Sequence, residues 1–397
     1  MMLWPLESGR ISVAKVVRAA AGQLSIPEGF PILLWDRMAI IEPAFRFLLE
    51  LATIPGRSHA AETVRTYAEH LHDWFDALEQ SGLDWQSIDE AGIAGYRNRM
   101  VQQPSRHTGR PYARSTINDR VRTVCRFYEW AHQQGLVKAR PFHFVDVRVW
   151  GRPRESMLMH VQARPSVVSA NALTLAEQER LPRPLRVDQL RLLFAQLDLP
   201  YRLMAEWALA TGLRRKELCG LRVAQVPQTV HLDADEHPLI GVPLSITKGD
   251  QPRTTYPPIR LVDRTHHYVE EVRTPLIRAL RRRRADYRPA PALFLNRRGG
   301  AVTHARLTAV FESAFRAAGL TGTGHWLRHT FAMTMLVRLQ RQAQLTPDLN
   351  PLKTVQILLG HRSIQSTAIY LRCVELHEAE LVRSLDYLYG EAIVDGR

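Results

Sequence analysis

Two stretches near the end of the chain decide how the sequence is interpreted: HWLRHTF at residues 325–331 and LLGHRSIQSTAIY at residues 358–370. Between them they supply histidines, the guanidinium of Arg328 and the phenol of Tyr370. A phenol becomes a nucleophile when positive charge nearby stabilises its anion. Guanidinium and imidazole donors also stabilise the charge that develops on an attacked phosphodiester. The two stretches therefore indicate attack on a phosphodiester without a metal.

Two arginines are candidates for binding the non-bridging oxygens of a phosphate. Arg328 stands in HWLRHTF, and Arg214 follows a Thr-Gly break in TGLRRKEL. A guanidinium offers two parallel N–H donors and keeps its charge. Glu217 lies one helical turn after Arg214 and is able to brace it. In a chain this rich in arginine the alternative is a surface position on an amphipathic helix, which we prefer for the neighbouring Arg215.

The titratable candidates are three histidines and one tyrosine. His325 lies three residues before Arg328, so both can face one side of a helix start. His361 follows a glycine that is expected to end a helix, and it can bind a non-bridging oxygen or assist deprotonation of the nucleophile. Tyr370 is the candidate nucleophile, and its pKa of about 10 requires nearby positive charge. The alternative for Tyr370, and the preferred interpretation of His329, is a packed structural residue.

Lys248 is the remaining candidate, in the sequence ITKGD at an expected hairpin turn. A leaving 5′ oxygen needs a proton, and a lysine beside the phosphate can supply it as a general acid. The alternative is a solvated turn lysine. His325 and His329 have the i, i+4 spacing of a zinc site, but no Glu follows His325 and no third ligand stands nearby. We therefore predict no metal.

The candidate residues occur in a characteristic order along the chain: Arg214, Lys248, His325, Arg328, His361 and Tyr370. This set resembles the catalytic boxes of the tyrosine recombinase (phage integrase) family, over roughly residue 40 to the end. The resemblance implies DNA cleavage by Tyr370 through a 3′-phosphotyrosine, with Glu217 and His329 in support. Because the phosphotyrosine stores the bond energy, the resemblance also implies that no cofactor is required. It also implies site-specific recombination in a homo-oligomer, a tetramer on a DNA synapse, that integrates or excises a mobile genetic element.

The composition agrees with a nucleic-acid partner. The net charge is +14 and the pI about 10.2, and basic side chains gain affinity for double-stranded DNA by releasing counterions from its backbone. No apolar run reaches the ~20 residues of a membrane span, and the first residues do not read as a secretory signal. The three cysteines, Cys125, Cys219 and Cys373, are far apart, which is typical of reduced thiols in a cytoplasmic protein.

The patterning predicts a mostly α fold with a small antiparallel β-sheet (α+β) in two domains. Helical periodicity covers residues 39–140 and returns in residues 183–397, where short alternating stretches interrupt it. The resemblance implies a helical, SAM-like core-binding domain and an integrase-type catalytic domain that close around DNA as a clamp. Residues 1–38 are an N-terminal arm or an extra element, and residues 141–182 are a basic linker or a clamp across a groove.

Helix ends can also be predicted. Four helices are expected between about residues 40 and 135. Gly82 is the expected C-cap of the second helix, and Ser87 is expected to begin the third. In the second domain, a helix is expected from Thr274 after the β stretches.

Two alternatives to recombination stay open. A type IB topoisomerase-like enzyme uses nearly the same residues, but it relaxes DNA by rotation and can work as a monomer. A DNA-binding accessory protein on this fold is expected to have a broken catalytic set, whereas all positions are filled here. The chain departs from the family pattern in a long Arg214–Lys248 spacing and an apparent insertion at residues 338–351. Accessory proteins are a further class of partner that the resemblance leaves open.

Overall fold

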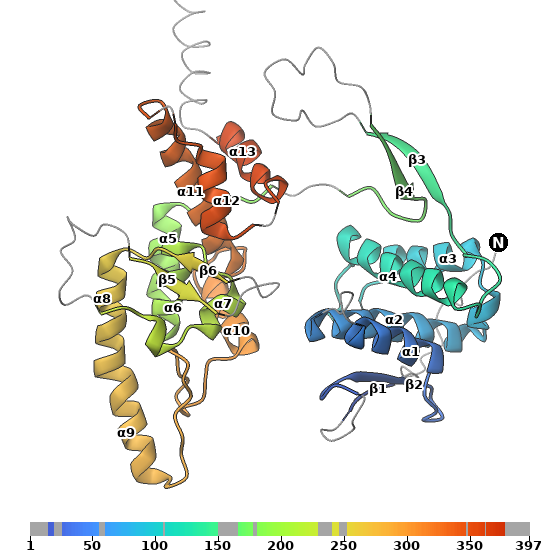
Figure 1. Cartoon of the computed structure of the whole chain (residues 1–397), viewed down its shortest axis with the longest axis horizontal. Helices are drawn as coiled ribbons and strands as arrows, with labels where there is room; N and C mark the ends of the chain where they lie inside the picture. The colour runs from blue at the N-terminus through green and yellow to red at the C-terminus, as the bar shows by residue number, and fades with distance from the viewer. Residues whose placement is uncertain are drawn as a thin grey trace, which may run out of the picture. The chain divides into compact units, whose positions relative to one another are not determined.

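The chain forms two compact units, residues 1–179 and 180–397, which we describe separately (Figure 1). The computed structural model describes the following residues: 15–19, 26–54, 60–105, 108–149, 166–177, 181–228, 240–245, 252–346, 348–361 and 363–377. Among these residues, no helix combines the length and hydrophobicity needed to cross a bilayer.

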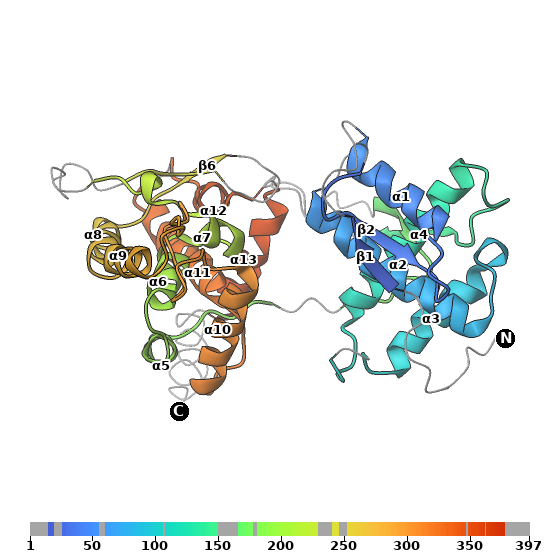
Figure 2. The ribbon, with the colours of Figure 1, turned by 90° about the horizontal axis from the view of Figure 1, so that it is seen from below.

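The first unit is a four-helix bundle with two antiparallel β-hairpins (Figures 1 and 2). Its elements are β1 (Lys15–Arg18), β2 (Pro31–Leu34), α1 (Glu42–Thr53), α2 (Ala61–Ser81), η1 (Trp85–Ser87), α3 (Glu90–Gln102), α4 (Arg114–Gln133), β3 (Phe144–Val149) and β4 (Ser166–Asn171). The β1–β2 hairpin lies against α2. The mostly helical character predicted for this part of the chain is confirmed.

Aromatic side chains fill the core of the bundle. Trp74 and Phe75 of α2 and Phe127 and Tyr128 of α4 are fully buried. Phe75 and Phe127 meet edge to face, with ring centroids 5.5 Å apart. Rings of this size bury the most apolar area per residue, and edge-to-face pairs add about 0.5–1.5 kcal/mol beyond that burial. Residues 1–38, predicted as an arm or an extra element, contribute the β1–β2 hairpin to this unit.

One predicted helix end is confirmed and one helix start is wrong. Gly82 caps α2 in the left-handed conformation, with φ 63°. Ser87 does not begin α3, because Trp85–Ser87 form a short 3₁₀ turn. The helix begins at Glu90 instead, where the Asp89 side chain accepts a hydrogen bond from Gly92 N at 2.9 Å.

The region predicted as a basic linker, residues 141–182, contains the antiparallel β3–β4 pair. After β4 the chain returns to α4, where Leu175 N donates to Asn118 Oδ1 at 2.8 Å and Asn118 Nδ2 donates to Leu175 O at 2.9 Å. Paired strands and a side-chain amide that satisfies the backbone fix this segment. Its described part up to residue 177 therefore packs with the first unit.

The second unit is mostly helical and includes a two-stranded antiparallel sheet, as its pattern predicts. Its elements are α5 (Val187–Ala195), α6 (Tyr201–Thr211), α7 (Arg215–Gly220), η3 (Val223–Gln225), β5 (Val242–Leu244), β6 (Arg253–Thr255), α8 (Ile259–Tyr268), η4 (Val269–Arg273), α9 (Thr274–Arg283), α10 (His304–Ala317), α11 (His325–Ala343), α12 (Pro351–Leu359) and α13 (Gln365–His377). Helix α11 contacts α6, α12 and α13. This packing brings distant parts of the sequence to one place.

The helix expected from Thr274 begins fifteen residues earlier, at Ile259. Leu261, Val262 and Thr265 are buried at helical spacing, and the chain continues through the π-helical turn η4 into α9. Thr265 also accepts a hydrogen bond from the indole of Trp207 at 3.0 Å. No element is predicted between the β stretches and Thr274, whereas the apolar period after Ile259 is that of a helix.

Candidate active site

Arg328 lies at the buried centre of the candidate site, with 2% of the residue exposed. Its Nη1 donates to the carbonyl of Gly212, at the end of α6, and its Nη2 donates to the carbonyl of Leu359 at 2.8 Å, at the end of α12. The guanidinium thereby joins the ends of two helices to α11. Loss of hydration and then the charge on Arg214 lower the pKa of Arg328, although a guanidinium stays protonated at neutral pH.

Arg214 immediately precedes α7 and is braced by Glu217. Its backbone N–H donates to Glu217 Oε2 at 2.7 Å, and its Nη1 donates to Oε1 at 3.2 Å. The Glu217 side chain is fully buried, whereas that of Arg214 is 22% exposed. Nη2 of Arg214 donates to the carbonyl of Gly360 at 3.3 Å. Arg214 therefore keeps an exposed part beside the buried Arg328.

A third arginine, Arg253, also binds Glu217, and the sequence pattern does not single it out. Its Nε donates to Oε1 at 3.2 Å and its Nη2 to Oε2 at 2.8 Å. Burial alone would raise the pKa of Glu217, but the hydrogen bonds and charge of Arg253, followed by those of Arg214, lower it. Glu217 is therefore a carboxylate held ionised between two guanidiniums. In the sequence, Arg253 only begins the alternating stretch RTTYPPI, part of which forms β6.

Tyr370 lies on α13 beside two histidines and is 2% exposed. Its hydroxyl is 3.1 Å from Nδ1 of His329. The ring of His361 is nearly parallel to the phenol ring, at 11° and 6.4 Å between centroids. His361 Nδ1 lies 2.9 Å from Oγ1 of Thr367, which the sequence pattern also does not single out. The phenol is thus within reach of a proton acceptor and close to a second imidazole.

The histidines of the site are held in their neutral form. Burial, then His325 and Arg328, lower the pKa of His329 to about 4. Burial, then the guanidiniums of Arg328 and Arg214, lower the pKa of His361 to about 3. His325, whose ring centroid is 4.5 Å from that of His329, has its pKa lowered to about 4, by loss of hydration and then by Arg328. Neutral imidazoles beside several guanidiniums indicate a site that attracts an anion.

Acid is expected to destabilise the free protein through these histidines. Because the folded chain keeps the pKa values of His329 and His361 near 4 and 3, the unfolded chain takes up protons first as the pH falls below about 6.5. The stability of the folded chain is therefore unaffected by the titration of these histidines above that pH. It is lost progressively as the pH falls toward their pKa values in the folded chain. Urea midpoints at about pH 7.5 and about pH 5 measure the effect. His361→Gln should flatten the dependence, and an unchanged dependence in this variant would contradict the assignment.

Gly212 is expected to tolerate no side chain. It ends α6 with φ 66°, and a Cβ there would lie 2.5 Å from the ring of Phe331 and 2.9 Å from Leu359 Cδ2. Gly212→Ala should lower the free energy of unfolding by about 1–2 kcal/mol for the left-handed conformation and by about 1–3 kcal/mol more for overpacking. Gly319→Ala is the matched control, because it has φ 68° and nothing within 4 Å. Equal losses for both in urea denaturation would contradict the overpacking.

Arg214, Arg253 and Arg328, with the carboxylate of Glu217, form what we call the arginine network. This network and the residues around Tyr370 include all but one of the residues predicted from the sequence. Arg214, Arg328, His361 and Tyr370 lie together, and His325 joins them through His329. Lys248 lies outside the described residues, in the connection between β5 and β6. Among the described residues, no group of three His, Cys, Asp or Glu side chains is placed to hold a metal.

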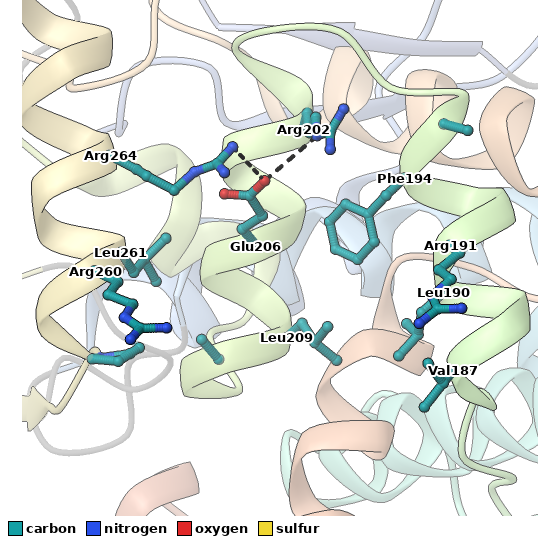
Figure 3. A pocket seen from close by; sticks show the side chains of 13 residues that line it. Val187, Leu190, Arg191, Phe194, Arg202, Glu206, Leu209, Arg260, Leu261 and Arg264 are labelled. Atoms are coloured by element: carbon teal, nitrogen blue, oxygen red, sulfur yellow. Dashed lines mark hydrogen bonds and ion pairs between the residues drawn. The ribbon is translucent and has the colours of Figure 1, made fainter.

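An open groove of about 630 Å³ lies elsewhere in the second unit, between α5, α6 and α8 (Figure 3). Its lining includes the apolar side chains of Leu190, Phe194 and Leu209. Within it, Glu206 accepts from Arg264 Nη2 at 2.9 Å. None of the candidate residues that the structure describes lines this groove, so the groove and the arginine network are separate features.

The chain matches two family profiles. Residues 183–375 match the "Phage integrase family", and residues 46–135 match "Phage integrase, N-terminal SAM-like domain". Among curated proteins, the tyrosine recombinase XerC of Halalkalibacterium halodurans is 27% identical over 323 residues, covering 79% of this chain and 88% of that protein. XerC of Mycobacterium leprae is 29% identical over 336 residues, covering 84% and 94%.

Solved structures share the fold. The XerH site-specific recombinase bound to palindromic difH substrate has a TM-score of 0.52 at 18% identity, covering 82% of this chain and 80% of that one. A lambda integrase dimer bound to a COC′ core site has a TM-score of 0.53 at 14% identity, covering 83% and 94%. With the profiles matching both units, the chain belongs to the phage integrase (tyrosine recombinase) family, and it is a DNA strand-transferring enzyme with the SAM-like N-terminal domain of that family.

Proposed function

We propose that this enzyme is a site-specific recombinase that cleaves and rejoins DNA through a 3′-phosphotyrosine on Tyr370. The observation that carries the proposal is the position of the Tyr370 hydroxyl, 3.1 Å from His329 Nδ1 and next to His361. The arginine network lies beside it, and there Glu217 is the carboxylate shared by Arg214 and Arg253. Excess positive charge next to a buried phenol suits attack on a phosphodiester.

The reaction can be assigned atom by atom. The Tyr370 oxygen attacks phosphorus, its proton passes to a neutral imidazole, and the bond from phosphorus to the 5′ oxygen breaks. His329 is the imidazole within hydrogen-bonding distance of the phenol. Arg214 and Arg328 stabilise the charge on the non-bridging oxygens, and His361 hydrogen-bonds the same phosphate. Lys248 protonates the leaving 5′ oxygen.

For partners, we propose double-stranded DNA and a tetramer of this chain on paired sites. The net charge of +14 supports an anionic partner, and the lambda integrase structure holds a dimer on its core site. For the biological role, we propose integration or excision of a mobile element. A role like that of XerC is the second candidate, and the similarity to XerC over most of this chain favours it.

Trapping on a nicked duplex tests the reaction class. A nick placed beside the scissile phosphate releases a short strand after cleavage, so rejoining fails and the covalent complex accumulates. We expect a protease-sensitive adduct on the 3′ phosphate, mapped by mass spectrometry to the peptide that contains Tyr370. Tight binding of the DNA without any adduct would contradict cleavage and favour an accessory DNA-binding protein.

A second assay separates recombination from topoisomerase-like activity. A recombinase should exchange strands only between two copies of its site and should assemble both copies in one complex. Relaxation of a supercoiled plasmid by a monomer, without pairing of sites, would favour the type IB topoisomerase-like alternative. Two substrates distinguish the two biological roles: the ends of a mobile element that lies next to the gene, and a chromosomal site.

A further inference from the structure

Three arginines from separate parts of the chain hold the end of α12. The carbonyls of its last two residues and of the capping Gly360 each accept from a different guanidinium, in the pairs Arg253–Leu358 at 2.6 Å, Arg328–Leu359 at 2.8 Å and Arg214–Gly360 at 3.3 Å. The last carbonyls of a helix have no partner within the helix and lie at the negative end of its dipole. Cationic donors there both satisfy the carbonyls and fix the position of the residue that follows, His361.

Arg253 differs from the other two arginines in where its donors point. Its Nε and Nη2 bind the two oxygens of Glu217, and its Nη1 binds the α12 carbonyl. Since each of its three guanidinium nitrogens has a protein partner, Arg253 is suited to hold other groups in place rather than to contact a phosphate.

The aliphatic part of Arg253 also packs against the residue just before His361. Gly360 has φ 62°, and a Cβ there would lie 2.5 Å from Cδ of Arg253 and 2.9 Å from its Nε. The arginine stem thus occupies the space beside the turn that leads into His361. Through Glu217 the same side chain reaches Arg214, 39 residues before Arg253 in sequence.

We propose that Arg253 is a positioning residue of the active site: it ties Glu217 to the last turn of α12 and so sets Arg214 and His361 in place for the phosphate. This inference rests on the proposed function for its catalytic consequence. Its structural part, the fixing of α12, concerns the free protein and can be measured without DNA.

Arg253→Gln removes the charge and the three-way contact while keeping a polar side chain of intermediate length. Hydrogen exchange should become faster in peptides covering the end of α12, where His361 N donates to Gln356 O at 3.1 Å. Single-turnover cleavage of the nicked duplex should slow about 10²-fold, the usual result of a small misplacement of catalytic groups, while DNA affinity changes by less than about twofold. Arg253→Lys should restore only part of the rate, because one ammonium cannot replace the bidentate fork.

Arg264→Gln is the matched control, since Arg264 pairs with Glu206 in the same unit and its side chain is 57% exposed. It should change neither exchange at α12 nor cleavage. Unchanged exchange in Arg253→Gln would overturn the inference, whatever the activity. Faster exchange with unchanged cleavage would overturn the positioning role. If the wild-type chain forms no adduct, the proposed function fails, while the exchange result still decides whether Arg253 holds α12.

Discussion

We expect Tyr370→Phe to abolish covalent attachment to DNA. The substitution removes the oxygen that we propose forms the bond to phosphorus, and the flanking guanidiniums cannot replace a nucleophile. We expect single-turnover cleavage to fall by about 10⁴-fold or more, in line with loss of a nucleophile in other enzymes. The fold should be kept, because the phenol ring packs in an apolar cluster with Phe331 and Leu359. Loss of the hydrogen bond to His329 should cost about 1 kcal/mol of stability.

The measurement combines the nicked duplex with a binding assay. Tyr370→Phe should bind the duplex with the affinity of the wild type, so loss of the adduct reports chemistry rather than binding. Tyr387→Phe is the matched control, because Tyr387 lies in the same C-terminal region without a histidine box before it. An adduct that persists in Tyr370→Phe and disappears in Tyr387→Phe would show that the nucleophile is a different tyrosine.

Short-range spacing explains what could be predicted from the sequence. Glu217 lies three residues after Arg214, and a helical turn alone brings the two side chains together. Gly82 could be predicted as a helix cap because its signal lies within a few residues of the helix end. The two-domain, mostly helical fold follows from the same kind of local periodicity, and the family resemblance rests on motifs that are contiguous in sequence.

Contacts between distant segments explain what could not be predicted. Arg253 reaches Glu217 across 36 residues, and His329 reaches Tyr370 across 41. Such pairs depend on how α11, α12 and α13 pack, and no periodicity encodes that. For His329 the sequence favours a packed structural residue, and this prediction leaves out the contact of His329 with the phenol. The helix from Ile259 was missed for a different reason, since the prolines before it suggest an extended stretch.

Arg328→Gln should damage both stability and chemistry. The guanidinium is 2% exposed and donates to the carbonyls of Gly212 and Leu359, and a glutamine amide cannot span both. Leaving a buried carbonyl unsatisfied costs about 1–3 kcal/mol, so we expect a loss of that size in the free energy of unfolding by urea. Cleavage should fall by about 10²–10³-fold, as for removal of one donor to a developing oxyanion.

The double effect separates Arg328 from an ordinary surface arginine. Arg215→Gln is the matched control, since this neighbour of Arg214 is exposed and bonds only Thr308 among the contacts described for it. It should change the unfolding free energy by less than about 0.5 kcal/mol and leave cleavage close to wild type.

Arg328→Lys keeps the charge but reaches one carbonyl at most, so it should recover part of the stability and little of the rate. If Arg328→Gln were as stable as the wild type, the guanidinium would not be joining the ends of α6 and α12. Cleavage unchanged in this variant would remove Arg328 from the phosphate site.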